Sequence, residues 1–138
     1  MLNLPQPIAI ATDRIHPDTL PGYVHLKVID LDNQVLFYQQ AIGLQLNWRE
    51  GNSAGLGIEG RDIVRLTQIA KGRRYHGVTG IYHFAILFPK RRELARVVAR
   101  LFSMRWQNYP TDHLMTKTTY VDDPEGNTIE LYCESPED

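Results

Sequence analysis

Hydrophobic and polar positions follow two different periods that alternate along this chain. Residues 23–29 form a short stretch rich in strand-forming residues, opened by Pro21 and Gly22, which is typical of a β-strand. Apolar positions then recur at helical spacing up to Gly43, where a helix is expected to end. Further strand-like stretches follow at residues 44–50, 54–59 and 63–69. The first half therefore predicts the order strand, helix, strand, strand, strand.

The second half repeats this order. Residues 80–88 form a strand-like stretch closed by Pro89, and residues 90–104 place apolar side chains on one helical face and arginines on the other. Three more strands are expected at residues 106–109, 114–121 and 128–133. The segments Gly-Tyr-Val-His and Gly-Ile-Tyr-His mark equivalent starts of two repeated units. The pattern predicts an α+β fold in which two βαβββ units form one eight-stranded, curved, cup-like mixed sheet with its helices outside.

The length and composition allow one core. A chain of 138 residues with 43% hydrophobic content has little room for two. Residues 1–21 contain four of the eight prolines and show no sustained period, so we expect an N-terminal arm there. Residues 22–138 are expected to form a single domain, with unit one at 22–70 and unit two at 79–134.

The charge balance and the single cysteine exclude several classes of protein. A net charge of -1 gives no reason to expect a nucleic-acid or membrane-surface partner. The apolar stretches are far shorter than the roughly 20 residues of a membrane helix, and the N-terminus does not resemble a secretory signal. Cys133 is alone, which excludes an intrachain disulfide and a Cys-rich zinc site. We expect a cytoplasmic protein.

Three side chains are candidate metal ligands. His25 and His83 occupy equivalent positions in the two repeated units, so pseudo-symmetry predicts that both face one concavity. Glu130 lies between Ile129 and Leu131, and strand alternation turns it to the face opposite these apolar neighbours. Each residue alone has an ordinary structural explanation, as a hydrogen-bonded histidine or a surface carboxylate. Together they predict two imidazoles and one carboxylate on one divalent metal, with coordination positions left open.

Two segments resemble a known family. HLKVIDLDNQVLFYQQAIGLQL, at residues 25–46, is similar to the opening strand and helix of the vicinal oxygen chelate superfamily. TKTTYVDDPEGNTIELY, at residues 116–132, resembles its closing hairpin. That superfamily contains glyoxalase I, bleomycin-resistance proteins and type I extradiol dioxygenases. The resemblance runs from about Pro17 to Tyr132 and implies that His25, His83 and Glu130 hold the metal.

Within that superfamily, the chain most closely resembles the N-terminal half of two-domain bacterial proteins like catechol 2,3-dioxygenase. The resemblance implies that Tyr120 hydrogen-bonds the substrate and that His113 transfers protons, although an ordinary strand tyrosine and a loop histidine are equally good explanations. It implies a small aromatic or vicinal-oxygen substrate. Fe(II) is the favoured metal, Mn(II) is the alternative, and Zn(II) or Ni(II) are not excluded.

Two other functions stay open on the same scaffold. One is a glyoxalase-type metal-dependent lyase or isomerase, and the other is a non-enzymatic binder of small molecules, like the bleomycin-resistance proteins. Aligning the turn at Gly60 with the turn at Gly126 places Val64 opposite Glu130. Valine cannot bind a metal, which counts against the four-ligand glyoxalase form. We expect a homodimer, or pairing with a missing C-terminal half.

Overall fold

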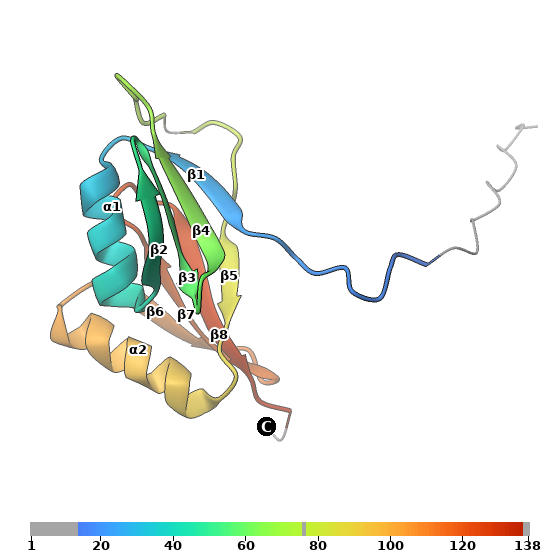
Figure 1. Ribbon diagram of the computed structural model, residues 1–138. Coiled ribbons are helices and arrows are strands. Elements are labelled where there is room, and N and C mark those ends of the chain that lie inside the picture. Colours follow the sequence, from blue (N-terminus) through green and yellow to red (C-terminus); the bar gives the residue numbers. More distant parts are fainter. Residues whose placement is uncertain (1–13, 76, 137–138) are drawn as a thin grey trace, which may run out of the picture.

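The computed structural model describes residues 14–75 and 77–136; residues 1–13 of the expected arm lie outside this range. Unit one contains β1 (Val24–Val28), α1 (Leu31–Phe37), the π-helical turn η1 (Tyr38–Ile42), β2 (Gln45–Glu50), β3 (Ser53–Ile58) and β4 (Arg61–Gln68). Unit two contains β5 (Phe84–Leu87), α2 (Arg91–Ser103), β6 (Asn108–Asp112), β7 (Thr116–Asp122) and β8 (Thr128–Glu134). The predicted fold class of two βαβββ units is confirmed (Figure 1).

The eight strands are divided between two four-stranded mixed sheets. Sheet A has the order β1-β4-β3-β2 and sheet B the order β5-β8-β7-β6. In each sheet the first strand of the unit pairs in parallel with the last, and the other pairs are antiparallel. The repeat seen in the sequence is therefore a repeat of topology. Paired strand positions in unit one therefore have structural counterparts in unit two.

Two strand boundaries differ from those expected. Strand β5 begins at Phe84, so His83 directly precedes the strand rather than lying in its middle. Strand β6 begins at Asn108 because Trp106 completes the end of α2: its backbone N–H donates to the Leu101 carbonyl oxygen, 2.9 Å away. The strand then continues through Pro110, which an edge strand tolerates.

The first helix begins and ends where local chemistry requires. The Asp30 carboxylate accepts a hydrogen bond from the Asn33 backbone N–H at 3.0 Å and caps α1. Gly43 follows η1 with φ of 93°, a left-handed conformation that glycine adopts without strain. The stop predicted from the sequence at Gly43 is therefore present, and Asp30 supplies the cap at the other end.

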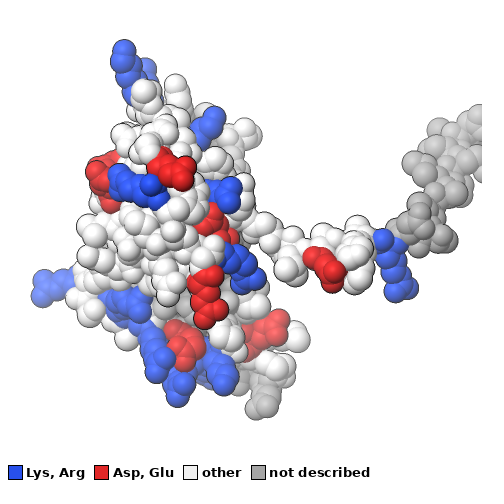
Figure 2. Space-filling model, viewed as in Figure 1, with Lys and Arg blue, Asp and Glu red and all other residues white. Residues whose placement is uncertain are grey.

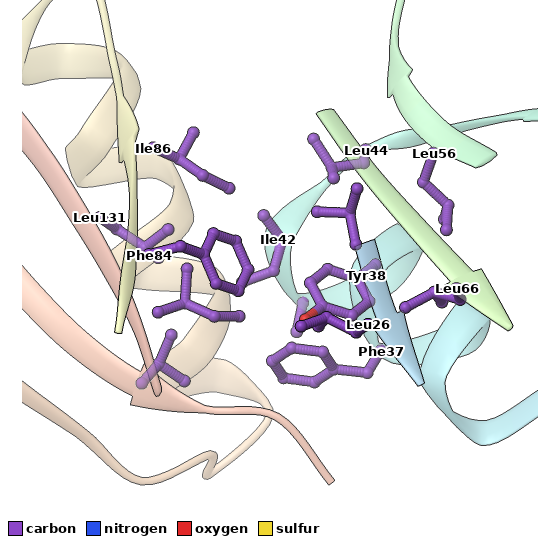
Figure 3. Close-up of a cluster of buried hydrophobic side chains, with 14 of the residues drawn as sticks. Leu26, Phe37, Tyr38, Ile42, Leu44, Leu56, Leu66, Phe84, Ile86 and Leu131 are labelled. Carbon is purple, nitrogen blue, oxygen red and sulfur yellow. The ribbon is translucent and has the colours of Figure 1, made fainter. Parts of the chain in front are cut away.

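One hydrophobic core joins the two units. Figure 3 shows buried side chains of β1, β4 and α1 facing those of β5 and β8. The buried Tyr38 hydroxyl donates to Asp123 Oδ2 at 3.2 Å across this contact. Glu125 Oε1 accepts from the backbone N–H groups of Ile29 and Asp30, at 2.8 and 2.9 Å. Each sheet therefore turns one face to a shared core, and its opposite, outer face lies away from that core.

Charged side chains gather over α2 at the lower left of the molecule (Figure 2). Its inner face buries Leu94, Val97 and Leu101, and Glu93 pairs with two arginines on the exposed side. The basic residues of this helix therefore form a solvated surface. Within the described residues, no helix is long and apolar enough to cross a membrane.

Candidate metal and substrate site

The outer face of sheet B carries a polar cluster centred on Glu130. In β8, Ile129 and Leu131 are buried in the core and Glu130 points to the other face. Its Oε2 lies 3.1 Å from His83 Nε2, and its Oε1 accepts a hydrogen bond from the Tyr120 hydroxyl at 3.2 Å. Strand pairing brings these residues together, because Tyr120 lies directly opposite Glu130 across β7 and β8.

His113 approaches the same cluster from the turn between β6 and β7. The His113 backbone N–H donates to the Thr116 carbonyl oxygen at 3.0 Å, which closes the turn. Its Nε2 lies 3.5 Å from the Tyr120 hydroxyl, and the two rings are perpendicular. Burial and the hydrogen bond to Glu130 raise the pKa of Tyr120 above its ordinary value, so the hydroxyl keeps its proton at neutral pH. It can donate one hydrogen bond at a time, to Glu130 or to another acceptor.

Aromatic side chains surround this cluster. A pocket of about 350 Å³ is lined by Tyr82, His83, Tyr109, Tyr120, Asp122 and Thr128. Tyr109 lies opposite Tyr120 across the β6–β7 pair, and the Tyr82 ring lies 5.0 Å from the His83 ring. Neither Tyr82 nor Tyr109 was predicted from the sequence as a site residue. The register of β6 on β7 would have been needed to find Tyr109.

Unit one carries an equivalent cluster on the outer face of sheet A. His25 Nε2 lies 2.9 Å from Thr67 Oγ1, and Thr67 Oγ1 lies 2.9 Å from Ser53 Oγ. Two residues after His25, Lys27 pairs with Thr67. Two residues after His83, Ala85 pairs with Glu130 in the same way. His25 and Thr67 are thus the structural counterparts of His83 and Glu130.

This register corrects the predicted alignment of Val64 with Glu130. Val64 is fully buried and faces the core, and Thr67 occupies the equivalent position. The alignment on the glycines failed because β4 runs from Arg61 and first meets β1 at Val64. In unit two, β8 meets β5 one residue after it begins. The conclusion that unit one offers no carboxylate at this position still holds.

The three predicted metal ligands are not gathered in one place. His83 and Glu130 are in contact, whereas His25 is exposed on the outer face of the other sheet. In residues 14–75 and 77–136, no group of three or more His, Cys, Asp or Glu residues is arranged to hold a metal ion. A single chain therefore brings together two of the three donors, and the assignment of all three stays a prediction.

His83 and Glu130 fit a shared metal by their own geometry. Histidine nitrogen and carboxylate oxygen ligands lie about 2.1 Å from a bound Zn²⁺. At right angles on one ion, two such ligands would be about 3.0 Å apart. The observed separation of Nε2 and Oε2 is 3.1 Å. The separation is also that of an ordinary hydrogen bond between the two side chains, so the contact is compatible with a shared metal and equally with a hydrogen-bonded pair.

Comparisons with known proteins bear on the family and the fold of this chain. A model of the Glyoxalase/Bleomycin resistance protein/Dioxygenase superfamily matches residues 21–131. A catechol-2,3-dioxygenase of Bacillus subtilis (strain 168) is 35% identical over 125 residues, which are 88% of this chain and 44% of that protein. The chain thus spans less than half the length of this curated relative.

Solved structures share the fold at low identity. A lactoylglutathione lyase from Agrobacterium tumefaciens is 19% identical with a TM-score of 0.67, covering 86% of this chain and 96% of that one. A fosfomycin resistance protein from Listeria monocytogenes is 15% identical with a TM-score of 0.61, covering 88% and 99%. At these identities the likeness concerns the fold alone.

Proposed function

The chain belongs to the Glyoxalase/Bleomycin resistance protein/Dioxygenase superfamily, and from this membership and the Glu130 cluster we propose that it is a metal-dependent, ring-cleaving dioxygenase of the extradiol type. The observation that carries the proposal is the contact of Glu130 with both His83 and Tyr120. A carboxylate and an imidazole in contact lie beside a protonated phenol, and the imidazole and the phenol line a pocket together with Tyr82 and Tyr109. Similarity to a catechol-2,3-dioxygenase supports an aromatic substrate with two adjacent oxygens.

We propose that the metal site is completed between two copies of the chain. His83 and Glu130 would come from one copy and His25 from the second, because within the described residues of one chain His25 is not grouped with the other two donors. A symmetry-related second copy can supply the donor that one chain does not bring to the site. The three side chains would hold a divalent metal there, Fe(II) by preference, which would supply Lewis-acid chemistry to a substrate with two adjacent oxygens.

The other residues of the cluster bind the substrate and move protons. Tyr120 keeps its proton and can turn its hydrogen bond from Glu130 to a substrate oxygen. His113, within 3.5 Å of that hydroxyl, is placed to take a proton from the substrate and return it, which is the role of a general acid and base. The rings of Tyr82 and Tyr109 line the pocket and would contact an aromatic substrate.

A second candidate function is small-molecule binding without a metal. It is favoured by the absence of any three-ligand group within the described part of one chain. A glyoxalase-type reaction is less well supported, because Thr67 stands where a fourth, carboxylate ligand would be needed. The dioxygenase and the metal-free binding protein differ in whether two copies of the chain together bind a metal.

Mixing two inactive variants tests the proposal. The His25→Ala and His83→Ala proteins should each bind little Fe(II). In a mixed dimer, one site combines both defects, while the other retains all three ligands. Random pairing should therefore restore about a quarter of the wild-type metal per chain. Metal content is measured by elemental analysis after anaerobic co-refolding, and His16→Ala, an exposed histidine in the lead-in to β1, is the matched control.

The outcomes separate the alternatives. Full metal occupancy in the His83→Ala protein would refute the proposed metal site. Loss of metal in both single variants, with no recovery in a mixture shown to contain dimers, would refute sharing between copies. The metal-loaded wild-type protein should then consume O2 with a catechol and form a yellow ring-opened product. No O2 uptake with a broad catechol panel, in protein that holds Fe(II), would favour the binding function.

A further inference from the structure

A second polar cluster lies on the outer face of sheet A, beside His25, and is organised around Arg65. The Arg65 guanidinium carbon lies 3.7 Å from the centre of the Tyr23 ring and 5.6 Å from the Trp48 ring. Its Nε donates to Asp62 Oδ2 at 2.6 Å. Arg65 therefore lies against two aromatic rings, with one edge held by a carboxylate.

Asp62 anchors this arrangement. Its carboxylate also accepts from Asn47 Nδ2 and from Trp48 Nε1, each at 2.9 Å. Burial raises the pKa of Asp62, but the hydrogen bonds from Asn47, Trp48 and Arg65 outweigh burial and hold this pKa below its ordinary value. The Asp62 side chain is only 6% exposed, whereas Arg65 is 37% exposed. The Asp62 carboxylate is thus buried and held by several hydrogen bonds, while the Arg65 guanidinium is still partly exposed to solvent.

Arg65 opens into a pocket of about 550 Å³ between β4, β5 and the segment that leads into β1. Arg61 also lines this pocket, and within the described residues its side chain has no ion-pair partner. Apolar walls come from Ile58, Ile63 and Leu87. Two arginines and a single, covered carboxylate line this pocket, so it carries a net positive charge beside an apolar surface.

We propose that this pocket binds the carboxylate of a small aromatic acid. Guanidinium groups match a carboxylate in shape and charge, and can bind it through paired N–H donors. The apolar walls suit a ring attached to that carboxylate. A free inorganic anion would use the arginines but gain nothing from Ile58, Ile63 or Leu87, which favours an organic acid over phosphate.

The pocket adjoins the proposed metal site. Arg65 pairs with His25 across β1 and β4, and neighbouring strands are about 4.8 Å apart. A substrate whose two oxygens reach the metal could therefore extend a carboxylate toward Arg65. The substrate class would be a catechol that bears a carboxylate. This link to the chelated substrate rests on the proposed function, whereas binding of the acid by the pocket does not.

Calorimetric titration of the metal-free protein tests the pocket by itself. Benzoate and its uncharged analogue benzamide are the probes, and wild-type protein should bind benzoate at least about tenfold more tightly. Arg65→Gln and Arg61→Gln should each reduce this preference. Arg61→Gln guards against misfolding, because it leaves no buried partner behind. Arg96→Gln, on the exposed side of α2, is the matched control and should behave as wild type.

Each result decides the matter. Equal affinity for benzoate and benzamide in wild-type protein would overturn the proposal. So would an unchanged preference in both the Arg61→Gln and Arg65→Gln proteins, each shown by circular dichroism to be folded. Tight binding of inorganic phosphate with no preference for benzoate would also overturn it. Because metal is absent, failure here is distinguishable from failure of the variant mixture to recover Fe(II).

Discussion

The Tyr38–Asp123 hydrogen bond joins the two units, and the Tyr38→Phe substitution would remove it alone. Tyr38 is fully buried in the first unit, and its hydroxyl donates to Asp123 Oδ2 at 3.2 Å in the second. Phenylalanine retains the ring and its packing. The same carboxylate oxygen keeps a 2.7 Å bond from Asn127 Nδ2, and Oδ1 keeps two backbone donors. The substitution therefore removes one hydrogen bond to the buried Asp123 carboxylate and leaves its other hydrogen bonds in place.

The magnitude follows from that remaining support. A hydrogen bond to a charged group contributes about 1.5–3 kcal/mol, and leaving such a group wholly unpaired costs more. Because Asp123 keeps three other bonds, we expect Tyr38→Phe to lower the free energy of unfolding by about 1–2 kcal/mol at pH 7. In urea the midpoint should fall while the slope stays unchanged.

The difference in the free energy of unfolding between wild type and Tyr38→Phe should become smaller at alkaline pH. Burial, followed by repulsion from Asp123, raises the pKa of Tyr38 far above its ordinary value of 10.0. The folded chain then keeps a proton that the unfolded chain releases, so the stability contributed by Tyr38 is complete below pH 10 and declines above it. Between pH 10 and pH 11 this decline is about 1 kcal/mol. The Tyr38→Phe protein has no such hydroxyl to titrate, so the two proteins should have nearly equal stability at pH 11.

Urea unfolding of both proteins at pH 7 and pH 11 provides the test. The remaining tyrosines titrate in both proteins, and their contributions cancel in the difference. Tyr75→Phe, at a residue that is 69% exposed, is the matched control and should leave the stability unchanged at both pH values. A difference between wild type and Tyr38→Phe that stays constant from pH 7 to pH 11 would refute the reasoning about the buried hydroxyl.

Three further substitutions have defined outcomes. On the proposed function, Tyr120→Phe should retain Fe(II) but slow catechol turnover, as measured by elemental analysis and O2 uptake. His113→Ala should do likewise, with a loss on the order of 100-fold; wild-type turnover would disprove its role. Gly55→Ala would place a Cβ 2.1 Å from Trp48 Nε1. Urea unfolding should show a loss of about 1–3 kcal/mol, whereas Gly22→Ala, which has open space around it, should match wild type.

Local pattern was enough to order the elements and to orient individual strands. Alternation in β8 placed Glu130 opposite its buried neighbours, and the same rule separates His25 from Leu26 in β1. Gly43 marked the end of the first helical segment. These features depend on the few residues next to them, because side-chain direction along a strand and backbone freedom at a turn are local properties.

The register in which the strands pair could not be predicted from the local sequence pattern. The turns at Gly60 and Gly126 look alike, yet Thr67 and not Val64 is the counterpart of Glu130. The residue at which β4 first pairs with β1 depends on how long the β3–β4 hairpin is before β1 joins it. This parallel pairing involves residues far apart in the sequence. The contact of Arg65 with Tyr23 was hidden for the same reason.

The sequence by itself determined the repeated units and the buried and outer faces of their strands. It also marked His25, His83 and Glu130 as candidate metal ligands by their side-chain chemistry. Only the tertiary structure decided that His83 meets Glu130 while His25 stays apart. The alternation of apolar residues determines which face of each strand is buried, but the way the two sheets are placed around the core depends on packing between residues far apart in the sequence. Burial of the apolar faces around one core, with Tyr38 and Asp123 paired across it, turns both histidine-bearing faces outward.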